Sequence, residues 1–424
     1  MCVEGAASSG DAGLSMNKTS LAQKAAFAVL AGLATVLLML VLAWQAKSPD
    51  WSDLMGFYAG TTLLRQGPRG ALYDPDRQLA CQQRIFGRTD PTRLYTHPPF
   101  EALVFLPLTY LPFPTAFILW DVLNLFILAW SLYLLRPYLA NFNTESRLII
   151  TVVILYPLIS TLREGQDTIL LLAALVAAFV SLKQNKEFAA GCALGASLFR
   201  FQFTLPFLVV FVVLKRWRLI LGVIAVGLAL CLASLALTGW AGALRYLALL
   251  RMLTGGGRFH AETIGMPNVR GFVYTLAAGR VEPRFLSVFV ALSSLALLGW
   301  SVRRWGSVAA WNPRGKAFDL LFSLSVVAAI GATFYSFMHD LVVLALPAAL
   351  VLEYCAAGHL SGVSRWRPVL PLILLFSMTA SLNVEGGNRF SYLLAPVLLF
   401  AFAISAELPR AQGVPPPDIE VNSM

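Results

Sequence analysis

The sequence contains few charged residues. Of its 424 residues, 13% are Asp, Glu, Lys or Arg and 58% are hydrophobic, and the mean hydropathy is +0.71. Soluble domains carry about a quarter charged residues. A water-soluble fold of this composition would leave large apolar areas in contact with water, so the composition excludes an ordinary soluble enzyme.

Cysteine and histidine are scarce as well, with five and four residues respectively. The cysteines are odd in number and widely spaced, which is typical of neither a disulfide framework nor a zinc site. The sequence also lacks a glycine-rich phosphate loop, a metal-ligand spacing and a nucleophile elbow. We therefore expect no metal and no cofactor.

Long apolar runs are what the sequence does contain. Runs such as 25–44 and 219–237 approach the roughly 20 residues that cross a bilayer as a helix, and lipid leaves the backbone few alternatives to helix. We predict an all-α integral membrane protein, a polytopic bundle of about 12 transmembrane helices. The first run exceeds the apolar part of a secretory signal, so we expect it to be retained as a span. The predicted segments are 25–46, 99–112, 115–135, 147–162, 168–183, 188–214, 218–238, 284–302, 317–335, 339–356, 367–382 and 390–406.

The basic residues predict the orientation. The formal charge is +10, but Lys and Arg cluster between the apolar runs, as the positive-inside rule describes, so we expect no nucleic-acid partner. With residues 1–24 in the cytoplasm, the parity of the segments places Lys215–Arg218 inside and two long loops, 47–98 and 239–283, outside. Residues 25–406 form the transmembrane domain and 407–424 a disordered cytoplasmic tail. We expect a multi-pass protein of the inner (plasma) membrane.

The first outer loop has helical patterns of its own. Apolar residues at spacings of three and four from Leu54 to Leu64 predict a juxtamembrane helix whose apolar face lies among lipid headgroups. Asp74 followed by Pro75 predicts the start of a second helix, which Gly87 ends. The same loop holds arginines that oppose the orientation rule and call for solvation or an anionic ligand. They are Arg65, Arg69, Arg77, Arg84, Arg88 and Arg93.

Six short segments carry a family resemblance. They are Asp53–Gly60 (DLMGFYAG), Leu72–Asp74 (LYD), Tyr95–Phe100 (YTHPPF), Gly165–Asp167 (GQD), Arg200–Gln202 (RFQ) and Tyr335–Asp340 (YSFMHD). In this order they resemble glycosyltransferase family 87, whose members are polytopic GT-C enzymes that use polyprenyl-phosphate mannose or related donors. Two positions depart from the pattern, with His97 where the family often has an aromatic residue and Arg200 where it often has lysine.

The resemblance implies transfer of a sugar, with mannose expected, from a polyprenyl-phosphate donor to a glycolipid or cell-envelope glycan at the outer face of the membrane. The mechanism it implies is inverting, and a carboxylate takes the proton of the acceptor hydroxyl. Asp53 matches the family's catalytic aspartate. Two alternatives stay open: Asp53 only stabilises the start of its helix, or the neighbouring Asp50 is the base.

The leaving phosphate needs cations near it, because it gains negative charge as the glycosidic bond breaks. The candidate phosphate-binding residues are His339, Arg200, Arg270 and Arg389, and further substrate-binding candidates from the matched segments are His97, Tyr58 and Gln166. A buried Arg200 can also be a structural ion pair, for which Asp121 and Glu164 are the candidate partners. Arg270 and Arg389 can be plain solvated arginines.

The rival hypothesis is a transporter or flippase of lipid-linked sugars. Such a protein would show repeated halves with polar groups near mid-membrane. The sequence shows no convincing internal repeat, and its candidate polar residues gather toward one side. A small-xxx-small pair, Gly191 and Gly195, is interpreted as a helix contact without chemistry.

Overall fold

The computed structural model describes residues 52–68, 70–254, 263–307, 311–359, 364, 366–384 and 389–413, and every regular element among them is helical. The predicted first span (25–46), Asp50 and most of the predicted tail lie outside these residues. Within them, seven helical stretches are long and apolar enough to cross a membrane by length and composition alone, a measure that counts the two short helices within 187–213 as one stretch. They are Phe113–Tyr138, Thr144–Glu164, Glu187–Val213, Trp217–Met252, Pro283–Gly306, Met338–Ala356 and Phe390–Ala411. The predicted count of twelve spans is therefore not confirmed.

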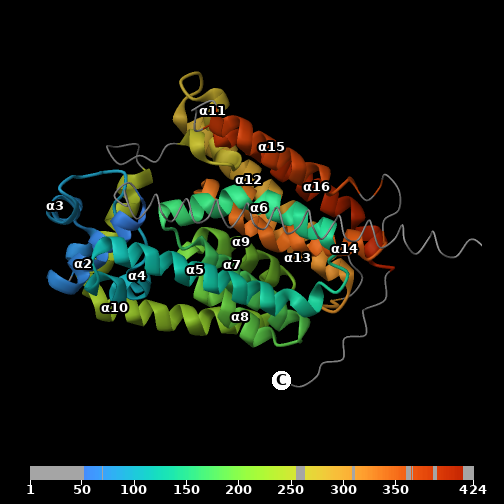
Figure 1. Ribbon diagram of the computed structural model, residues 1–424, viewed down its shortest axis with the longest axis horizontal. Helices are drawn as coiled ribbons and strands as arrows, with labels where there is room; N and C mark the ends of the chain where they lie inside the picture. Colours follow the sequence, from blue (N-terminus) through green and yellow to red (C-terminus); the bar gives the residue numbers. More distant parts are fainter. Residues whose placement is uncertain are drawn as a thin grey trace, which may run out of the picture.

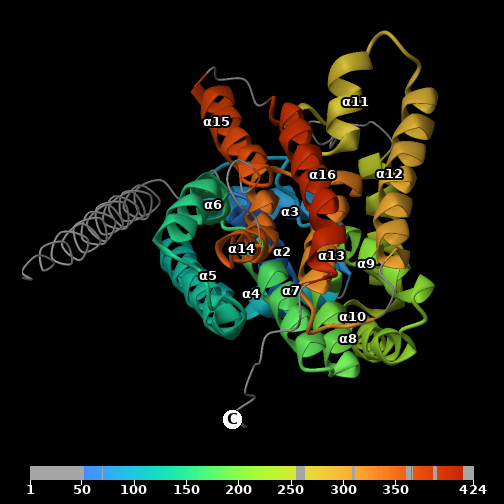
Figure 2. The same ribbon diagram turned by 90° about the vertical axis from the view of Figure 1, so that its right-hand side faces the viewer.

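The long helices lie roughly along one direction and form a bundle (Figure 1). They are α5 (Phe113–Leu135), α6 (Thr144–Glu164), α7 (Thr168–Lys183), α8 (Glu187–Ala196), α9 (Phe201–Val213), α10 (Trp217–Thr254), α12 (Pro283–Gly306), α13 (Lys316–Ala332), α14 (Ala345–Ala356), α15 (Leu370–Val384) and α16 (Leu394–Ala411). Seen end-on, α13 and α14 lie inside the bundle, and almost every residue in both is buried (Figure 2). α16 extends to Ala411, beyond the predicted end of the domain at 406.

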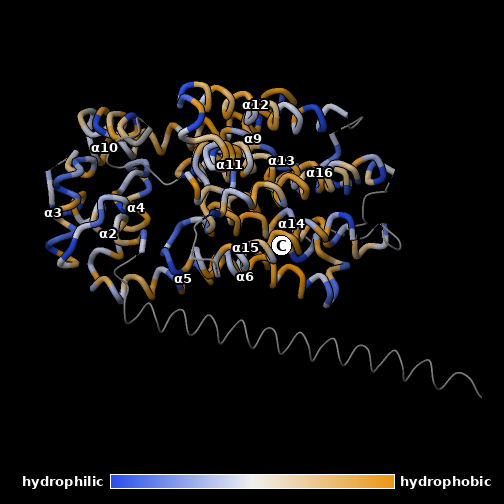
Figure 3. The backbone as a smooth tube through the Cα atoms, turned by 90° about the horizontal axis from the view of Figure 1, so that it is seen from above, coloured by the Kyte–Doolittle hydropathy of each residue, from blue (hydrophilic) through white to orange (hydrophobic). Residues whose placement is uncertain are grey.

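The outward-facing side chains of the bundle are largely apolar, as contact with lipid requires. Helices α10 and α12 expose large apolar side chains such as Leu228, Leu232, Phe289 and Leu292. Figure 3 shows apolar colouring along the bundle helices and hydrophilic colouring mainly where the chain turns and in α3 (Pro75–Phe86). Apolar side chains facing outward along whole helices are what a bilayer requires. The chain is therefore a multi-pass membrane protein.

Ion pairs mark one end of the bundle, which we call the basic end. Lys183 Nζ lies 2.5 Å from Asp319 Oδ1, which joins α7 to α13, and Lys316 Nζ lies 3.5 Å from Glu353 Oε1, which joins α13 to α14. Arg216 Nη1 lies 3.1 Å from Glu187 Oε1, which joins the starts of α8 and α10. This end contains Lys215–Arg218, the segment predicted to face the cytoplasm.

The predicted span 188–214 is a hairpin that enters the bundle and returns. A Cβ on Gly191 would lie 2.0 Å from the Leu219 carbonyl oxygen, and one on Gly195 would lie 2.7 Å from Val226 Cβ. Residue numbers rise together along this contact, so α8 and α10 run parallel, and α9 must lead the chain back to the basic end. At 1.5 Å per residue neither α8 nor α9 spans the roughly 30 Å of a bilayer core. Gly191 and Gly195 are confirmed as helix-contact residues.

A second predicted span, 99–112, is also wrong. It consists of η3 (Pro99–Glu101), α4 (Ala102–Phe105) and η4 (Leu106–Tyr110), none long enough to cross a membrane. Each of these two errors removes one membrane crossing from the predicted topology. The side predicted for every segment after residue 214 is therefore unchanged. Between the two errors the predicted sides are reversed: the α6–α7 connection lies opposite the basic end, whereas 136–143 lies at it, where Asn141 bonds to Glu353.

At the other end, which we call the site end, short helices form a layer (Figure 1). The layer contains α2 (Leu54–Gln66), η2 (Ala71–Tyr73), α3, η3, α4 and η4. The second predicted loop helix is confirmed, because Asp74 caps α3 through the Arg77 N–H at 3.2 Å and Gly87 ends it with φ 70°. The apolar face of α2 packs on protein instead of facing headgroups, since Leu54 and Phe57 are buried in one cluster with the α5 start.

The predicted loop 239–283 is partly helical. α10 continues to Thr254 beyond a kink at Gly239, where φ is 68° and ψ is 178°. The part of α10 beyond this kink packs on the layer, with the Tyr246 ring 5.0 Å from that of Tyr73 and Arg245 Nη1 donating to the Gly70 carbonyl at 3.1 Å. Further on, α11 (Val269–Ala277) begins at Asn268, whose side chain caps it by accepting from the Gly271 N–H.

Candidate functional site

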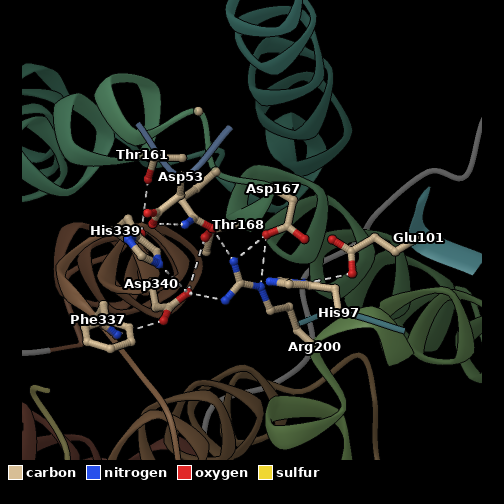
Figure 4. A network of polar contacts seen from close by, with 12 residues as sticks. Asp53, His97, Glu101, Thr161, Asp167, Thr168, Arg200, Phe337, His339 and Asp340 are labelled. Atoms are coloured by element: carbon tan, nitrogen blue, oxygen red, sulfur yellow. Dashed lines mark hydrogen bonds and ion pairs between the residues drawn. The ribbon is translucent and has the colours of Figure 1, made fainter. Parts of the chain in front are cut away.

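A cluster of polar side chains lies where the layer meets the bundle (Figure 4). Its members come from the start of α2, the segment 93–101, the α6–α7 connection, the tip of the α8–α9 hairpin and η8 (Met338–Leu344). The labelled members include Asp53, His97, Glu101, Asp167, Arg200, His339 and Asp340. The structure thus brings together five of the residues predicted from the sequence: Asp53, His97, Gln166, Arg200 and His339.

Close packing on α2 brings segment 93–95 to Asp53. A Cβ on Gly56 would lie 2.5 Å from the Arg93 carbonyl oxygen, and one on Gly60 would lie 2.4 Å from Tyr95 Cβ, so the segment lies directly on the helix. Glutamines of α3 satisfy its backbone: Gln78 Oε1 accepts from the Tyr95 N–H at 2.6 Å, and Gln82 Nε2 donates to the Arg93 carbonyl at 2.8 Å.

A tight turn between α6 and α7 presents Gln166 and Asp167 to the cluster. Gly165 ends α6 in the left-handed region with φ 64°, and a Cβ there would lie 2.7 Å from Leu54 Cβ, so glycine is required on both counts. The Trp120 indole N–H of α5 donates to the Gly165 carbonyl at 3.0 Å. The GQD pattern at 165–167 is therefore a turn in which the glycine makes the tight bend possible, and the next two residues direct their side chains into the cluster.

Asp53 is held by two side chains and remains partly accessible. Arg93 Nη1 donates to its Oδ1 at 2.6 Å and Gln166 Nε2 to its Oδ2 at 2.5 Å, and the side chain is 35% exposed. Although Asp53 occupies the N-cap position of α2, its side chain makes no capping hydrogen bond. Its contacts therefore point into the cluster, which disfavours the alternative in which it only stabilises the helix start.

Arg200 lies at the tip of the α8–α9 hairpin and is buried. Its Nε donates to Asp167 Oδ1 at 2.9 Å, and its Nη1 lies 3.6 Å from Asp340 Oδ1. Arg200 Nη2 also donates to Gln166 Oε1, which links this pair to Asp53. The candidate partners Asp121 and Glu164 were wrong: the ion pair exists, but with Asp167 and Asp340.

His97, Glu101 and Asp167 form a compact subcluster. His97 Nδ1 lies 2.8 Å from Glu101 Oε2, and the His97 ring packs edge-on against Phe57 at 4.8 Å. Burial, with the charge of Arg200, lowers the pKa of His97 to about 3, so the ring is neutral near pH 7. Burial and the neighbouring Asp167 raise the pKa of Glu101 well above its usual range. Burial opposes ionisation of Asp167 too, but Arg200 outweighs it and the pKa of Asp167 falls to about 2.

His339 lines the same cluster from η8. Its carbonyl accepts from the Thr161 hydroxyl at 3.1 Å, which joins η8 to α6. Its Nε2 is buried, lies 3.7 Å from Asp340 Oδ1 and has no hydrogen-bond partner among the described residues. Asp340 itself is fixed, because its Oδ2 accepts from the Phe337 N–H at 2.8 Å. His339 is thus a positioned side chain with a nitrogen still available.

Three predicted residues make their contacts elsewhere. The Tyr58 hydroxyl donates to the Leu111 carbonyl at 2.7 Å, and its ring packs on Phe113. Arg270 is buried with its guanidinium 3.9 Å from the centre of the Phe334 ring, so it is not a solvated arginine. Arg389 is exposed, as a solvated arginine would be. Their predicted roles in substrate binding stay predictions.

Sequence reasoning missed Arg93 and Glu101 as members of the site. Arg93 was one of six unexplained arginines in the loop; it bridges Asp53 and Glu164, with Nη1 to Glu164 Oε2 at 3.0 Å, so for this residue ion pairing is the explanation. Glu101 stands four residues after His97, a spacing at which two side chains meet on one helical turn. That spacing is a signal for Glu101 in the sequence, but the prediction of a span over 99–112 conceals it.

The family comparison agrees with the motifs. The sequence model of glycosyltransferase family 87 matches residues 95–329, more than half of the chain. The match includes His97, Gln166 and Arg200, whereas Asp53 and His339 lie outside it. No curated protein matches the chain.

Proposed function

The chain belongs to glycosyltransferase family 87 and is a membrane glycosyltransferase, and from this premise we propose its donor, acceptor and mechanism. The donor is a polyprenyl-phosphate sugar, with mannose as the expected sugar. The acceptor is a glycolipid or a cell-envelope glycan, and transfer takes place at the outer face of the inner (plasma) membrane. The sugar is transferred with inversion at its anomeric carbon.

The proposal rests chiefly on the Asp53 carboxylate. It is the most exposed carboxylate of the cluster, at 35% against 21% for Glu164, whereas Glu101, Asp167 and Asp340 are buried. Arg93 and Gln166 each occupy one position on its oxygens, and a carboxylate oxygen has two lone pairs, so each oxygen can still accept a proton. A fixed carboxylate at the mouth of a buried polar site is suited to general-base catalysis.

The proposed step is a single displacement. Asp53 takes the proton of the acceptor hydroxyl while that oxygen forms a bond to the anomeric carbon. The bond between the anomeric carbon and the phosphate oxygen breaks, and the polyprenyl phosphate leaves with the electron pair. A positioned base contributes about 10²–10⁴-fold to such a step.

His339 is the proposed contact for the leaving phosphate. Its Nε2 lacks a partner among the described residues, whereas the Arg200 guanidinium is bonded to Asp167 and Gln166. A nitrogen that is already positioned can donate to developing negative charge without reorganisation. In this proposal Arg200 fixes the positions of Asp167 and Gln166 through its hydrogen bonds, and its charge acts on the phosphate without direct contact.

The rival is a flippase for lipid-linked sugars. It needs polar groups at mid-membrane in corresponding halves of the chain, whereas the cluster described here collects at one end of the bundle, where α2 and α7 begin and α6 ends. The cluster also places a candidate base beside a candidate phosphate contact, an arrangement that transport does not require.

The test is incubation of purified protein with radiolabelled polyprenyl-phosphate mannose and extracted membrane lipid. Asp53→Asn keeps the side-chain shape but loses the basic lone pair, so transfer should fall by at least about 10²-fold while donor still binds. Asp50→Asn is the matched control. If Asp53→Asn turns over like the parent and Asp50→Asn is inactive, Asp50 is the base. If both variants are fully active, base catalysis from this loop is wrong and the flippase hypothesis gains.

A further inference from the structure

Three metal-ligating groups converge in the subcluster of His97, Glu101 and Asp167. One candidate ligand atom from each residue lies within 4.8 Å of the other two. His97 lies just before η3 and Glu101 at the end of η3, whereas Asp167 comes from the start of α7 on the other side (Figure 4). Small movements of these side chains would bring all three atoms within the spacing of a shared cation, since metal–ligand distances are about 2.0–2.2 Å.

Two oxygens of the subcluster have no donor from outside the pair of carboxyl groups. Glu101 Oε1 and Asp167 Oδ2 are buried, and no N–H or hydroxyl group among the described residues donates to either of them. The Glu101 and Asp167 carboxyl groups can hydrogen-bond to each other only when one of them is protonated. The residues are 2% and 0% exposed, so bulk water does not solvate them. In Figure 4 the two carboxyl groups face one another. Two facing carboxylates repel unless a proton or a cation lies between them.

The neighbours hold the ligands in position and leave the facing oxygens open. Arg200 donates to Asp167 Oδ1 and not to Oδ2, which fixes the direction of the carboxylate. The Phe57 ring supports His97 from one side. Outer contacts that orient ligands in this way are a regular feature of metal sites.

The charge of the surrounding site also calls for a cation. Among the described residues, Arg200 faces Asp167 and Asp340, while Arg93 faces three carboxylates, those of Asp53, Asp90 and Glu164. Each of these two arginines therefore faces more carboxylates than its single positive charge can neutralise. A lipid phosphate entering here would meet excess negative charge, which a divalent ion would offset.

We propose that His97, Glu101 and Asp167 bind one divalent cation of the Mn²⁺ or Zn²⁺ type. Both ions accept an imidazole nitrogen together with carboxylate oxygens. Binding of the ion does not depend on the proposed function, but its role, which is to offset charge near the leaving phosphate, rests on that function. The expectation from the sequence, that no metal takes part, came from linear spacing, which cannot register a ligand 66 positions after Glu101.

The experiment measures Mn²⁺ binding to the purified full chain in detergent after EDTA treatment, by loss of the free Mn²⁺ signal in electron paramagnetic resonance. The expected result is one ion per chain. Glu101→Gln and His97→Gln should each weaken binding about tenfold or more. Glu164→Gln is the matched control, since it removes a carboxylate that bonds to Arg93 in the same cluster but is not a proposed ligand, and it should bind Mn²⁺ as the parent does.

A parent chain that binds neither Mn²⁺ nor Zn²⁺ overturns the proposal, as does binding that neither Glu101→Gln nor His97→Gln weakens. In both cases the facing carboxyl groups share a proton instead. Thermal unfolding with and without Mn²⁺ is a second readout: the ion should raise the unfolding temperature of the EDTA-treated parent and not that of Glu101→Gln, because an ion bound to the folded chain stabilises it. Transfer is not measured, so failure of the metal site and failure of the glycosyltransferase mechanism are distinguishable.

Discussion

Replacing Arg200 with glutamine should strongly destabilise the protein. Arg200 is 6% exposed, and its partners Asp167 and Asp340 are 0% and 1% exposed, so solvent screens their interaction very little. Arg200→Gln leaves two buried carboxylates with less compensation. Removing one member of a buried pair costs about 3–5 kcal/mol, mostly because the remaining charge is uncompensated.

A double variant separates charge burial from lost packing. If the buried charge causes most of the cost, Asp167→Asn should recover part of the stability lost in Arg200→Gln, with a coupling of about 0.5–3 kcal/mol. The free energy of unfolding can be measured by SDS titration in mixed micelles, followed by tryptophan fluorescence. The control is Arg284→Gln, whose partner Glu282 is exposed and whose loss should change stability by at most about 1 kcal/mol.

Two results would refute this reasoning. The first is an Arg200→Gln protein within about 1 kcal/mol of the parent, and the second is a double variant whose loss equals the sum of the single losses. Donor titration adds the functional side. Arg200→Ala should impair donor use more than His97→Ala does. If donor dependence is unchanged while stability falls, Arg200 is a structural ion pair only.

Three further predictions concern other contacts. Gly191→Leu should destabilise the protein by at least about 1–3 kcal/mol, because a Cβ there would lie 2.0 Å from a backbone oxygen. Gly299→Ala should be tolerated, because a Cβ there would have no neighbour within 4 Å. Thermal unfolding of both variants checks this prediction. Single cysteines at Lys186 and Arg216 should react with an impermeant thiol reagent from the same side of the membrane, since the hairpin returns to the basic end; labelling from opposite sides contradicts the hairpin. Arg93→Gln should lower turnover more than it changes the KM for donor, because Arg93 orients the proposed base; an equal turnover with a raised KM would instead make it a donor-binding residue.

Local sequence signals predicted local structure well. The cap at Asp74 and the stop at Gly87 define α3 as expected, since both depend on neighbouring backbone groups alone. The apolar runs around 115–135 and 284–302 became α5 and α12 for the same reason. The membership of Asp53, Gln166 and Arg200 in one site could also be predicted, but only through the family's motifs.

The sequence did not reveal whether an apolar run crosses the bundle once or folds back within it. Hydropathy measures whether a run is apolar, and the run from 188 to 214 has the length of a long span although it folds back around Arg200. Segment 99–112 carried a usable warning in Pro107 and Pro112, which interrupt a helix. The pairing of Arg200 with Asp340, 140 positions apart, is set by tertiary packing and has no local signature.

The part of α10 beyond the kink at Gly239 has a consequence for how the protein is made. The layer at the site end starts near residue 52, but Tyr246 and Leu249 of α10 complete its apolar cluster. The ribosome must therefore add almost 200 further residues before this layer can close. His339 and Asp340 arrive later still. During synthesis the early helices must stay in the membrane before the layer closes and before His339 and Asp340 reach the cluster, so the complete cluster is among the last parts of the molecule to assemble.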